Sequence, residues 1–290
     1  MKRWAAYALL LPGILLDVLF LSGVVNALVQ SLGYIPALGL EDFTVKYYLE
    51  IFTRPQFLQS VLLSVWIALV SSVTACVFGV LVCAALALKK GAGRSVGQLV
   101  RLPILVPHTV AALFVIMIFS QSGLLSRALF AAGLIGAQES FPPLLFNAGG
   151  IGIIVAYLWK EIPFVAYFVL ALMSSVSATL GEASENLGVN KFKTFLHVTL
   201  PLSMPAVFKA FIIIFAFSFG AYELPYLLGA TLPRALPVEA YVEYLNPDLQ
   251  HRPYAMAMNG VMLLLTLGAA LLYYRLMNGS VGGVRGDKDG

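Results

Sequence analysis

The sequence predicts an all-α, polytopic membrane protein with six transmembrane helices and both termini in the cytoplasm. Of its 290 residues, 60% are apolar and only 11% are charged, and the mean hydropathy is +0.90. A soluble domain is usually about 45–50% apolar and about 25% charged, so this apolar excess points to a bilayer as the solvent. The apolar runs are also far longer than buried strands and reach the roughly 20 residues that cross a membrane. The same composition excludes an intrinsically disordered chain.

Six runs share the length and the scarcity of charge that a membrane crossing needs. They are Ala5–Ser31, part of Ser60–Leu88, Leu102–Ser120, Gly149–Met173, Ala206–Leu228 and Pro253–Leu276. The first run follows a basic N-terminus, as in a signal peptide, but it is too long for a cleaved segment and has no clear cleavage site. We therefore expect it to stay in the protein as the first membrane helix.

The distribution of Lys and Arg predicts the orientation of these helices. With the N-terminus inside, the inner segments carry 11 of the 18 Lys and Arg residues and the outer segments carry 5. An excess of Lys and Arg marks cytoplasmic loops. Both termini are therefore expected on the cytoplasmic side.

The second run has small residues at every fourth position. They are Ser71, Ala75, Gly79, Cys83 and Ala87. Small residues on one face let membrane helices approach closely, so this face is expected to pack against protein. The two cysteines, Cys76 and Cys83, have neither a metal-site spacing nor a CxxC spacing, and Cys83 is interpreted as a packing residue.

Two outer segments have features of their own. Ser126–Leu134 is expected to form a short helix at the membrane interface. Gly229–Arg252 is rich in proline and mixed in charge, and it is a candidate surface for an external partner.

The inner loop between the fourth and fifth runs carries helix start and stop signals. Thr179 and Glu182 form a capping box, which predicts a helix that begins just after Thr179. Gly188 suits the left-handed position that ends a helix. Asn190 is expected to cap a second short helix, and Leu200-Pro201 is expected to end it before the fifth span.

The spacing within this loop is specific. Glu182-Ala-Ser184 is followed by three residues, Gly188, nine residues and then Val198-Thr-Leu-Pro. This pattern resembles the EAA loop of the permease subunits of binding-protein-dependent ABC importers, with Ser184 in place of the third Ala and Val198 in place of Ile. The resemblance implies a MetI-like fold of one plus five transmembrane helices in a bacterial inner membrane.

The resemblance also implies a division of the chain. Residues 1–56 would hold the N-terminal helix and the first outer loop, and residues 57–277 the permease domain. The coupling loop would lie at about 174–204 within that domain, and residues 278–290 would be a flexible cytoplasmic tail.

Partners follow from the same resemblance. It implies two ABC ATPase subunits, a second permease subunit that is identical or related, an external solute-binding protein, and membrane lipid. The ATPase-coupling residues would be Glu182, Ala183, Ser184, Gly188, Leu200 and Pro201. Because the sequence has no G-x-x-x-x-G-K-[ST] motif, ATP and Mg are expected on the partner ATPase. The chain itself is expected to be no enzyme and to have no cofactor, catalytic residue, metal site or nucleic-acid partner.

Ionisable residues inside membrane spans are costly and usually face a cavity or a partner. One hypothesis is that Lys160 pairs with an acid of another helix while Glu161 or Glu223 lines the translocation path. The alternative is structural ion pairing alone. The candidate path residues are Asp17, Trp159, Lys160, Glu161, Tyr222 and Glu223. His108 is interpreted as a buried polar group rather than a ligand.

Two stretches bear on the substrate. Residues 217–229 and 159–164 resemble the corresponding segments of permeases in the spermidine/putrescine, ferric iron and thiamine branch. A polyamine or a similar small organic cation is the expected solute, with ferric iron, thiamine or an amino-acid-derived solute as alternatives. An autonomous channel or secondary transporter is the alternative class, but it would not need an EAA loop.

Overall fold

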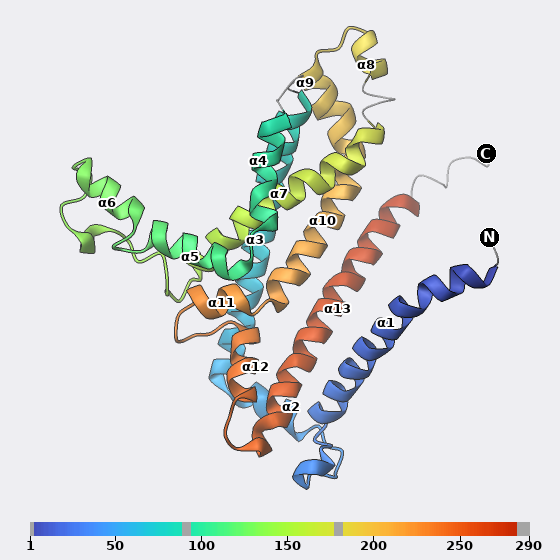
Figure 1. The fold of residues 1–290 in the computed structure, drawn as a ribbon, viewed down its shortest axis with the longest axis vertical. Coiled ribbons are helices and arrows are strands. Elements are labelled where there is room, and N and C mark those ends of the chain that lie inside the picture. Colours follow the sequence, from blue (N-terminus) through green and yellow to red (C-terminus); the bar gives the residue numbers. More distant parts are fainter. Residues whose placement is uncertain (1–2, 89–93, 177–181, 283–290) are drawn as a thin grey trace. The chain divides into compact units, whose positions relative to one another are not determined.

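The computed structural model describes residues 3–88, 94–176 and 182–282, and helices dominate these ranges (Figure 1). The described residues contain no β-strand, and their single isolated bridge joins Ile35 and Leu40. Six helical segments in the described ranges are long and apolar enough to cross a membrane. The all-α fold and the six spans are thus confirmed, whereas the side on which the termini lie stays a prediction.

Among the described residues, five helices have more than twenty residues each. They are α1 (Arg3–Ser31), α3 (Pro55–Leu88), α7 (Ile151–Val176), α10 (Leu200–Gly220) and α13 (Arg252–Gly282). The short helix expected over Ser126–Leu134 is also present, as α6 (Leu124–Ala131).

The third expected span is two helices rather than one. α4 (Arg94–Leu105) ends before Val106, and α5 (His108–Phe119) begins after Pro107. Pro107 has ψ 149°, which takes the chain out of the helical path, and a proline has no N–H to continue the hydrogen-bond ladder. The prediction of one helix over 102–120 was wrong because hydropathy alone does not register this break.

The fifth expected span also ends early. α10 stops at Gly220, Ala221 has the extended ψ of 134°, and α11 (Glu223–Leu228) begins two residues later. The prediction of a span reaching Leu228 was therefore wrong. Glu223 lies in the first turn of a separate short helix rather than inside a long one.

The loop between α7 and α10, which is the predicted inner loop, folds into two short helices. α8 (Glu182–Asn186) is followed by Gly188 at φ +84°, and the side chain of Asn190 accepts a hydrogen bond from Phe192 N at 3.0 Å at the start of α9 (Lys191–Thr194). The glycine stop and the Asn190 cap are thus confirmed. The expected start after Thr179 lies outside the described residues.

The second short helix does not end at Leu200-Pro201. It continues through a π-helical turn, η4 (Phe195–Thr199), directly into α10. The N–H of Leu200 reaches the carbonyl of Phe195, five residues back. Pro201 directly follows this π-helical turn and lies within the continuous helical segment, so the expected helix end there was wrong.

The described chain forms two compact units. The first comprises residues 1–58 and 236–265, and it includes α1, η1 (Pro36–Leu38), α2 (Lys46–Thr53), α12 (Leu236–Tyr244), η5 (Leu249–His251) and the first part of α13. Its polar side chains pair with one another: Glu243 accepts from Arg54 at 3.3 Å and contacts His251 Nδ1 at 2.8 Å.

The second unit comprises residues 59–235 and 266–290, and α7 is its centre. α7 packs against α4, α5, α10 and α11 (Figure 1). The small-residue face of α3 meets it: a Cβ added at Gly79 would lie 2.6 Å from the Val165 Cβ, and Cys83 Sγ lies 3.7 Å from the sulfur of Met173. The expected close packing of this face is confirmed for the residues whose side chains are described.

Candidate functional site

A cavity of about 230 Å³ lies in the second unit, on one side of α7. Most of its lining is apolar, and four ionisable side chains interrupt that lining. The lining residues are Ile104, His108, Tyr157, Lys160, Glu161, Phe164, Ile213, Ile214 and Phe217. A concave, mostly apolar site with a few polar groups is the usual form of a small-molecule site.

Glu161 is the buried acid of this cavity. It is only 4% exposed, and its Oε1 accepts a hydrogen bond from the hydroxyl of Ser218 on α10. Its Oε2 is buried and has no hydrogen-bond partner within 3.5 Å in the described part of the chain. The Ser71 hydroxyl lies near this carboxyl group. Its own hydrogen bond, however, goes to the carbonyl of Ala68 at 3.3 Å. One oxygen of Glu161 thus keeps acceptor capacity at the cavity.

Lys160 has a different kind of partner from the one hypothesised. Its ammonium donates to the backbone carbonyl of Pro103 at 3.1 Å and also to that of Val106. Both carbonyls lie at the break between α4 and α5. The structure therefore gives this lysine two backbone acceptors in place of the acid of another helix.

Glu223 lies next to the cavity, in contact with His108. The Nδ1 atom of His108 lies 3.4 Å from Glu223 Oε2, with side-chain exposures of 29% and 55%. The His108 ring also lies 5.4 Å, centroid to centroid, from that of Phe217. Sequence reasoning treated His108 as a buried polar group and missed its place on the cavity. Its position directly after Pro107, at the start of a helix, was the available signal.

Tyr157 completes the polar face of α7, one turn before Lys160. It is 1% exposed, and its hydroxyl donates to the carbonyl of Ser218 at 3.4 Å. Tyr157, Lys160 and Glu161 therefore lie within about one turn of α7; Tyr157 and Glu161 both bond to Ser218 on α10, whereas Lys160 bonds to the break between α4 and α5.

The other candidate path residues lie elsewhere. Trp159 is 37% exposed and meets Phe114 edge-on, with the ring centroids 6.2 Å apart. Tyr222 precedes α11 and packs against Tyr226 at 5.1 Å. Asp17 is on α1 in the first unit, where it is exposed. The structure thus brings Lys160, Glu161 and Glu223 together and does not place Trp159 on the same cavity.

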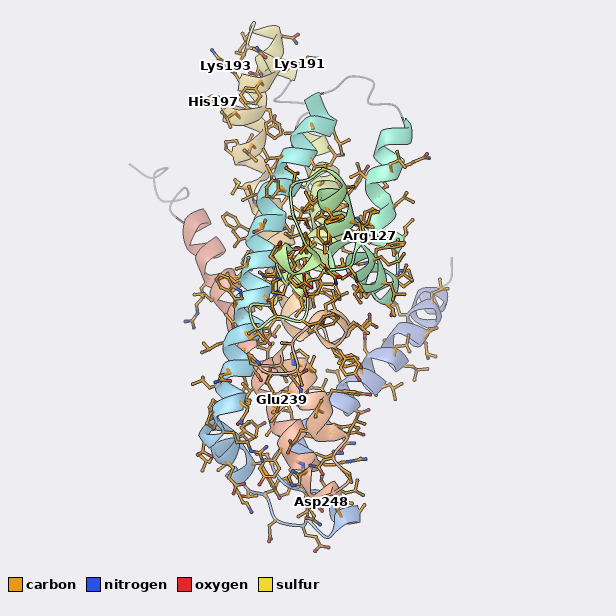
Figure 2. The ribbon with its side chains drawn as sticks, turned by 90° about the vertical axis from the view of Figure 1, so that its left-hand side faces the viewer. Arg127, Lys191, Lys193, His197, Glu239 and Asp248 are labelled. Atoms are coloured by element: carbon orange, nitrogen blue, oxygen red, sulfur yellow. The ribbon has the colours of Figure 1, made fainter. Side chains whose placement is uncertain are left out.

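The inner loop is anchored to the second unit through α9. The hydroxyls of Ser184 on α8 and Thr194 on α9 are 3.1 Å apart. Thr194 is 3% exposed, and Phe195 packs into the cluster formed by α3, α7 and α10. Lys191, Lys193 and His197 project from α9 and η4 (Figure 2). Leu187, next to the glycine turn, is 85% exposed, so the loop presents an open apolar tip.

The described residues contain no group of three or more His, Cys, Asp or Glu side chains that could hold a metal ion. The lining of the cavity provides hydrogen bonds, ionisable groups and apolar contact.

Comparison with known proteins places the chain in a family. Residues 62–281 match the model of the binding-protein-dependent transport system inner membrane component. That match covers well over half of the sequence. The chain belongs to this family. It is a permease subunit of an ABC importer and a multi-pass inner-membrane protein, and its role is transport rather than catalysis.

Individual relatives of the permease carry different substrate names. A probable molybdenum ABC transporter permease of Haloferax volcanii is 27% identical over 95% of this chain and 91% of its own length. A probable sulfate transport permease of Chlorella vulgaris is 26% identical over 76% of this chain and 79% of its own. A spermidine/putrescine permease PotC homolog of Mycoplasma genitalium is 28% identical over 44% and 45%. These names agree on the class of transporter and differ on the solute.

A solved structure agrees on the fold. The permease superimposes with a TM-score of 0.75 on a chain of the bacterial alginate ABC transporter in complex with alginate pentasaccharide-bound periplasmic protein. The two chains are 20% identical, and the match covers 94% of this chain and 93% of the other. At this identity the likeness supports the MetI-like fold and says nothing of the solute.

Proposed function

We propose that this permease subunit forms part of a translocation path beside α7, and that the path carries a small organic cation such as a polyamine. The observation that carries the proposal is the cavity at which Glu161 and Lys160 meet His108, with Glu223 next to His108. Irregular backbone at membrane depth is tolerated where it lines a cavity or is buried in protein. Two helix breaks beside one cavity are typical of a solute path.

The balance of unused polar groups favours a cation. The ammonium of Lys160 is engaged by two carbonyls, whereas Glu161 Oε2 has no hydrogen-bond partner in the described residues and Glu223 is half-exposed. An ammonium group of a solute would provide the donor that Glu161 lacks. The apolar remainder of the lining suits the methylene chain of a polyamine. Thiamine, an amino-acid-derived solute and ferric iron are the alternatives that also carry positive charge.

An oxyanion is the second candidate, because the relatives named for molybdenum and sulfate match most of this chain. One structural feature supports it. α5 begins at His108 on the cavity wall, and the N-terminal end of a helix attracts anions. Lys160, on the same wall, adds a positive charge.

The inner loop is the proposed site of coupling to the ATPases. In this proposal α8, with Glu182, Ala183 and Ser184, docks on an ATPase subunit, and Gly188 provides the turn behind it. Leu200 and Pro201 connect the loop to α10. Because η4 runs into α10 without interruption, a displacement of the loop would be passed directly to the helix that carries Ser218 and Phe217.

The assembly would contain two ATPases, which bind ATP and Mg, and a second permease subunit. An external binding protein would deliver the solute. The alginate transporter with its periplasmic protein supports this last partner, since that chain shares the fold.

Two experiments test these proposals. The first is purification of the tagged chain from its native host in mild detergent, with identification of the co-purifying subunits. An ATPase and a second permease in stoichiometric amounts are expected, and a chain that purifies alone would contradict the assembly. Gly188→Pro and Glu182→Lys should then abolish ATP-dependent uptake while the chain still inserts in the membrane.

The second experiment measures uptake into proteoliposomes that contain the purified complex and its binding protein. Labelled spermidine, molybdate and sulfate are compared, with and without ATP. Glu161→Gln and Glu223→Gln should each lower spermidine uptake several-fold, and Glu139→Gln, an exposed acid on η2 (Gln138–Ser140), is the matched control. Uptake of molybdate or sulfate without spermidine uptake would replace the cation by the oxyanion.

A further inference from the structure

We propose that Lys160 is a positioning residue: its ammonium replaces the amide hydrogen that Pro107 lacks, and so it holds the break between α4 and α5 that places His108 on the cavity. The transport part of this inference rests on the proposed function. The structural part concerns only the contacts within this chain.

The break leaves the last carbonyls of α4 and that of Val106 without their helical donors, and the carbonyls of Pro103 and Val106 are two of them. In a continuous α-helix, the carbonyl of Pro103 would accept from the N–H of residue 107, but residue 107 is a proline and has none. The carbonyl of Val106 would accept from residue 110, but the ψ of 149° at Pro107 interrupts that path. The first hydrogen bond after the break is Ala111 N to the carbonyl of Pro107, at 3.0 Å.

Lys160 supplies donors to these same two carbonyls, at 3.1 Å to that of Pro103 and also to that of Val106. A carbonyl without a donor is expensive inside a membrane. A positive charge is also favoured at the C-terminal end of a helix, where the helix dipole is negative, and α4 ends at Leu105. The Lys160 side chain thus provides both the hydrogen-bond donors for these carbonyls and the positive charge at the C-terminal end of α4.

The hydrogen bonds of Lys160 connect α7 to the C-terminal end of α4, and other contacts between these helices support the connection. α7 packs against α4 and α5, and the guanidinium of Arg101 on α4 lies 4.4 Å from the ring centre of Tyr167 on α7. Lys160 therefore fixes the far end of α4 against the middle of α7, where a helix interrupted by proline would otherwise be free to bend.

This arrangement places His108 on the wall of the cavity. It is the first residue of α5, its ring faces Phe217, and its Nδ1 lies 3.4 Å from Glu223. If the break closed into a regular helix, the turn that carries His108 would rotate and shift. Lys160 acts on the path through His108 rather than through the solute.

The decisive experiment combines Lys160→Met with Pro107→Ala, which restores the missing N–H. Thermal unfolding of the purified full-length chain in detergent is measured for the wild type, both single variants and the double variant. Lys160→Met should lower the melting temperature by about 5 °C, from the loss of charge-assisted hydrogen bonds. In the Pro107→Ala background the same substitution should lower it by less than half as much. Lys160→Arg, which keeps charged donors, should recover most of the loss.

Lys209→Met is the matched control, because Lys209 is an exposed lysine on another membrane helix, α10. It should leave the melting temperature unchanged in both backgrounds. If Lys160→Met does not accumulate as a folded chain, accumulation of the double variant supports the inference and its failure overturns it. A Lys160→Met chain as stable as the wild type, or one equally impaired in both backgrounds, would also overturn it.

Transport separates positioning from mere stabilisation. The double variant should regain stability but not ATP-dependent spermidine uptake, since the break that places His108 is lost, whereas Lys160→Arg should regain both. A double variant with full uptake would contradict the positioning role. The unfolding measurements involve no solute, so failure of spermidine uptake in the wild type would overturn the proposed substrate and leave the result on Lys160 intact.

Discussion

The break between α4 and α5 and the break between α10 and α11 interrupt two membrane helices beside the same cavity, and α7 donates a hydrogen bond to each. Lys160 donates to the carbonyls of Pro103 and Val106. Tyr157, one turn earlier, donates to the carbonyl of Ser218 at 3.4 Å, which the extended Ala221 deprives of its regular donor at residue 222.

The donors differ in charge and in burial. Lys160 is a charged, half-buried side chain with several N–H groups, and it serves a break that contains a proline. Tyr157 is neutral and 1% exposed, and it donates a hydrogen bond to a break that contains no proline. The comparison shows that a helix break made by proline requires more hydrogen-bond donors from neighbouring helices, because proline removes a backbone donor as well as changing the direction of the chain.

The largest effect among the tests of this comparison is expected at Ser218, which belongs to the second break. Ser218→Ala removes the hydroxyl that donates to Glu161 Oε1 and leaves that buried carboxyl group short of a donor. A buried acceptor that loses its donor costs about 1–3 kcal/mol, so the free energy of unfolding should fall by about 2 kcal/mol. Denaturant or thermal unfolding in detergent measures it.

Ser203→Ala is the matched control for Ser218. Ser203 is also a buried serine on α10, at 3% exposure, but its hydroxyl has no hydrogen-bond partner in the described part of the chain. Its removal should be neutral or slightly stabilising. Equal losses for the two serines would show that Glu161 does not depend on Ser218.

A smaller effect is expected at Tyr157. Tyr157→Phe keeps the buried ring and removes only the hydroxyl, so the loss should be about 1 kcal/mol, as for a neutral hydrogen bond. Thermal unfolding beside Lys160→Gln gives the comparison directly, and Tyr274→Phe, at an exposed position, is the control. A loss at Tyr157 that exceeds the loss at Lys160 would reverse the order that we assign to the two breaks.

The smallest effect on stability is expected at Glu223. Its contact with His108 is partly open to solvent, and such pairs contribute about 0–1 kcal/mol. Glu223→Gln should therefore change the free energy of unfolding by about 0.5 kcal/mol or less, while it lowers spermidine uptake. A double-mutant cycle with His108→Gln measures the pair, and a coupling energy well above about 1 kcal/mol would mean that the contact holds α5 and α11 together.

The sequence predicted those parts of the fold that depend on local pattern. Six apolar runs gave six membrane-spanning segments, since length and hydropathy are properties of the run itself. The turn at Gly188 and the cap at Asn190 were also predictable, because a left-handed glycine and an Asn side chain act within a few residues of their own position.

Other features were not readable in advance. Hydropathy continues through Val106-Pro107 and through Ala221-Tyr222, so each break was absorbed into a longer span. The continuous helical path from α9 through η4 into α10 was not predicted either. A proline at position 201 predicts a helix end unless the preceding π-helical turn is known.

The sequence by itself determined the solvent, the number of spans and the inner loop with its EAA-like spacing, because these depend on the composition and order of neighbouring residues. Only the tertiary structure decided the partners of the ionisable groups: carbonyls 54 and 57 residues away for Lys160, Ser218 for Glu161 and Glu223 for His108. Such pairs depend on how each helix is rotated and where it breaks. Periodicity along one helix contains no information on the rotation of another.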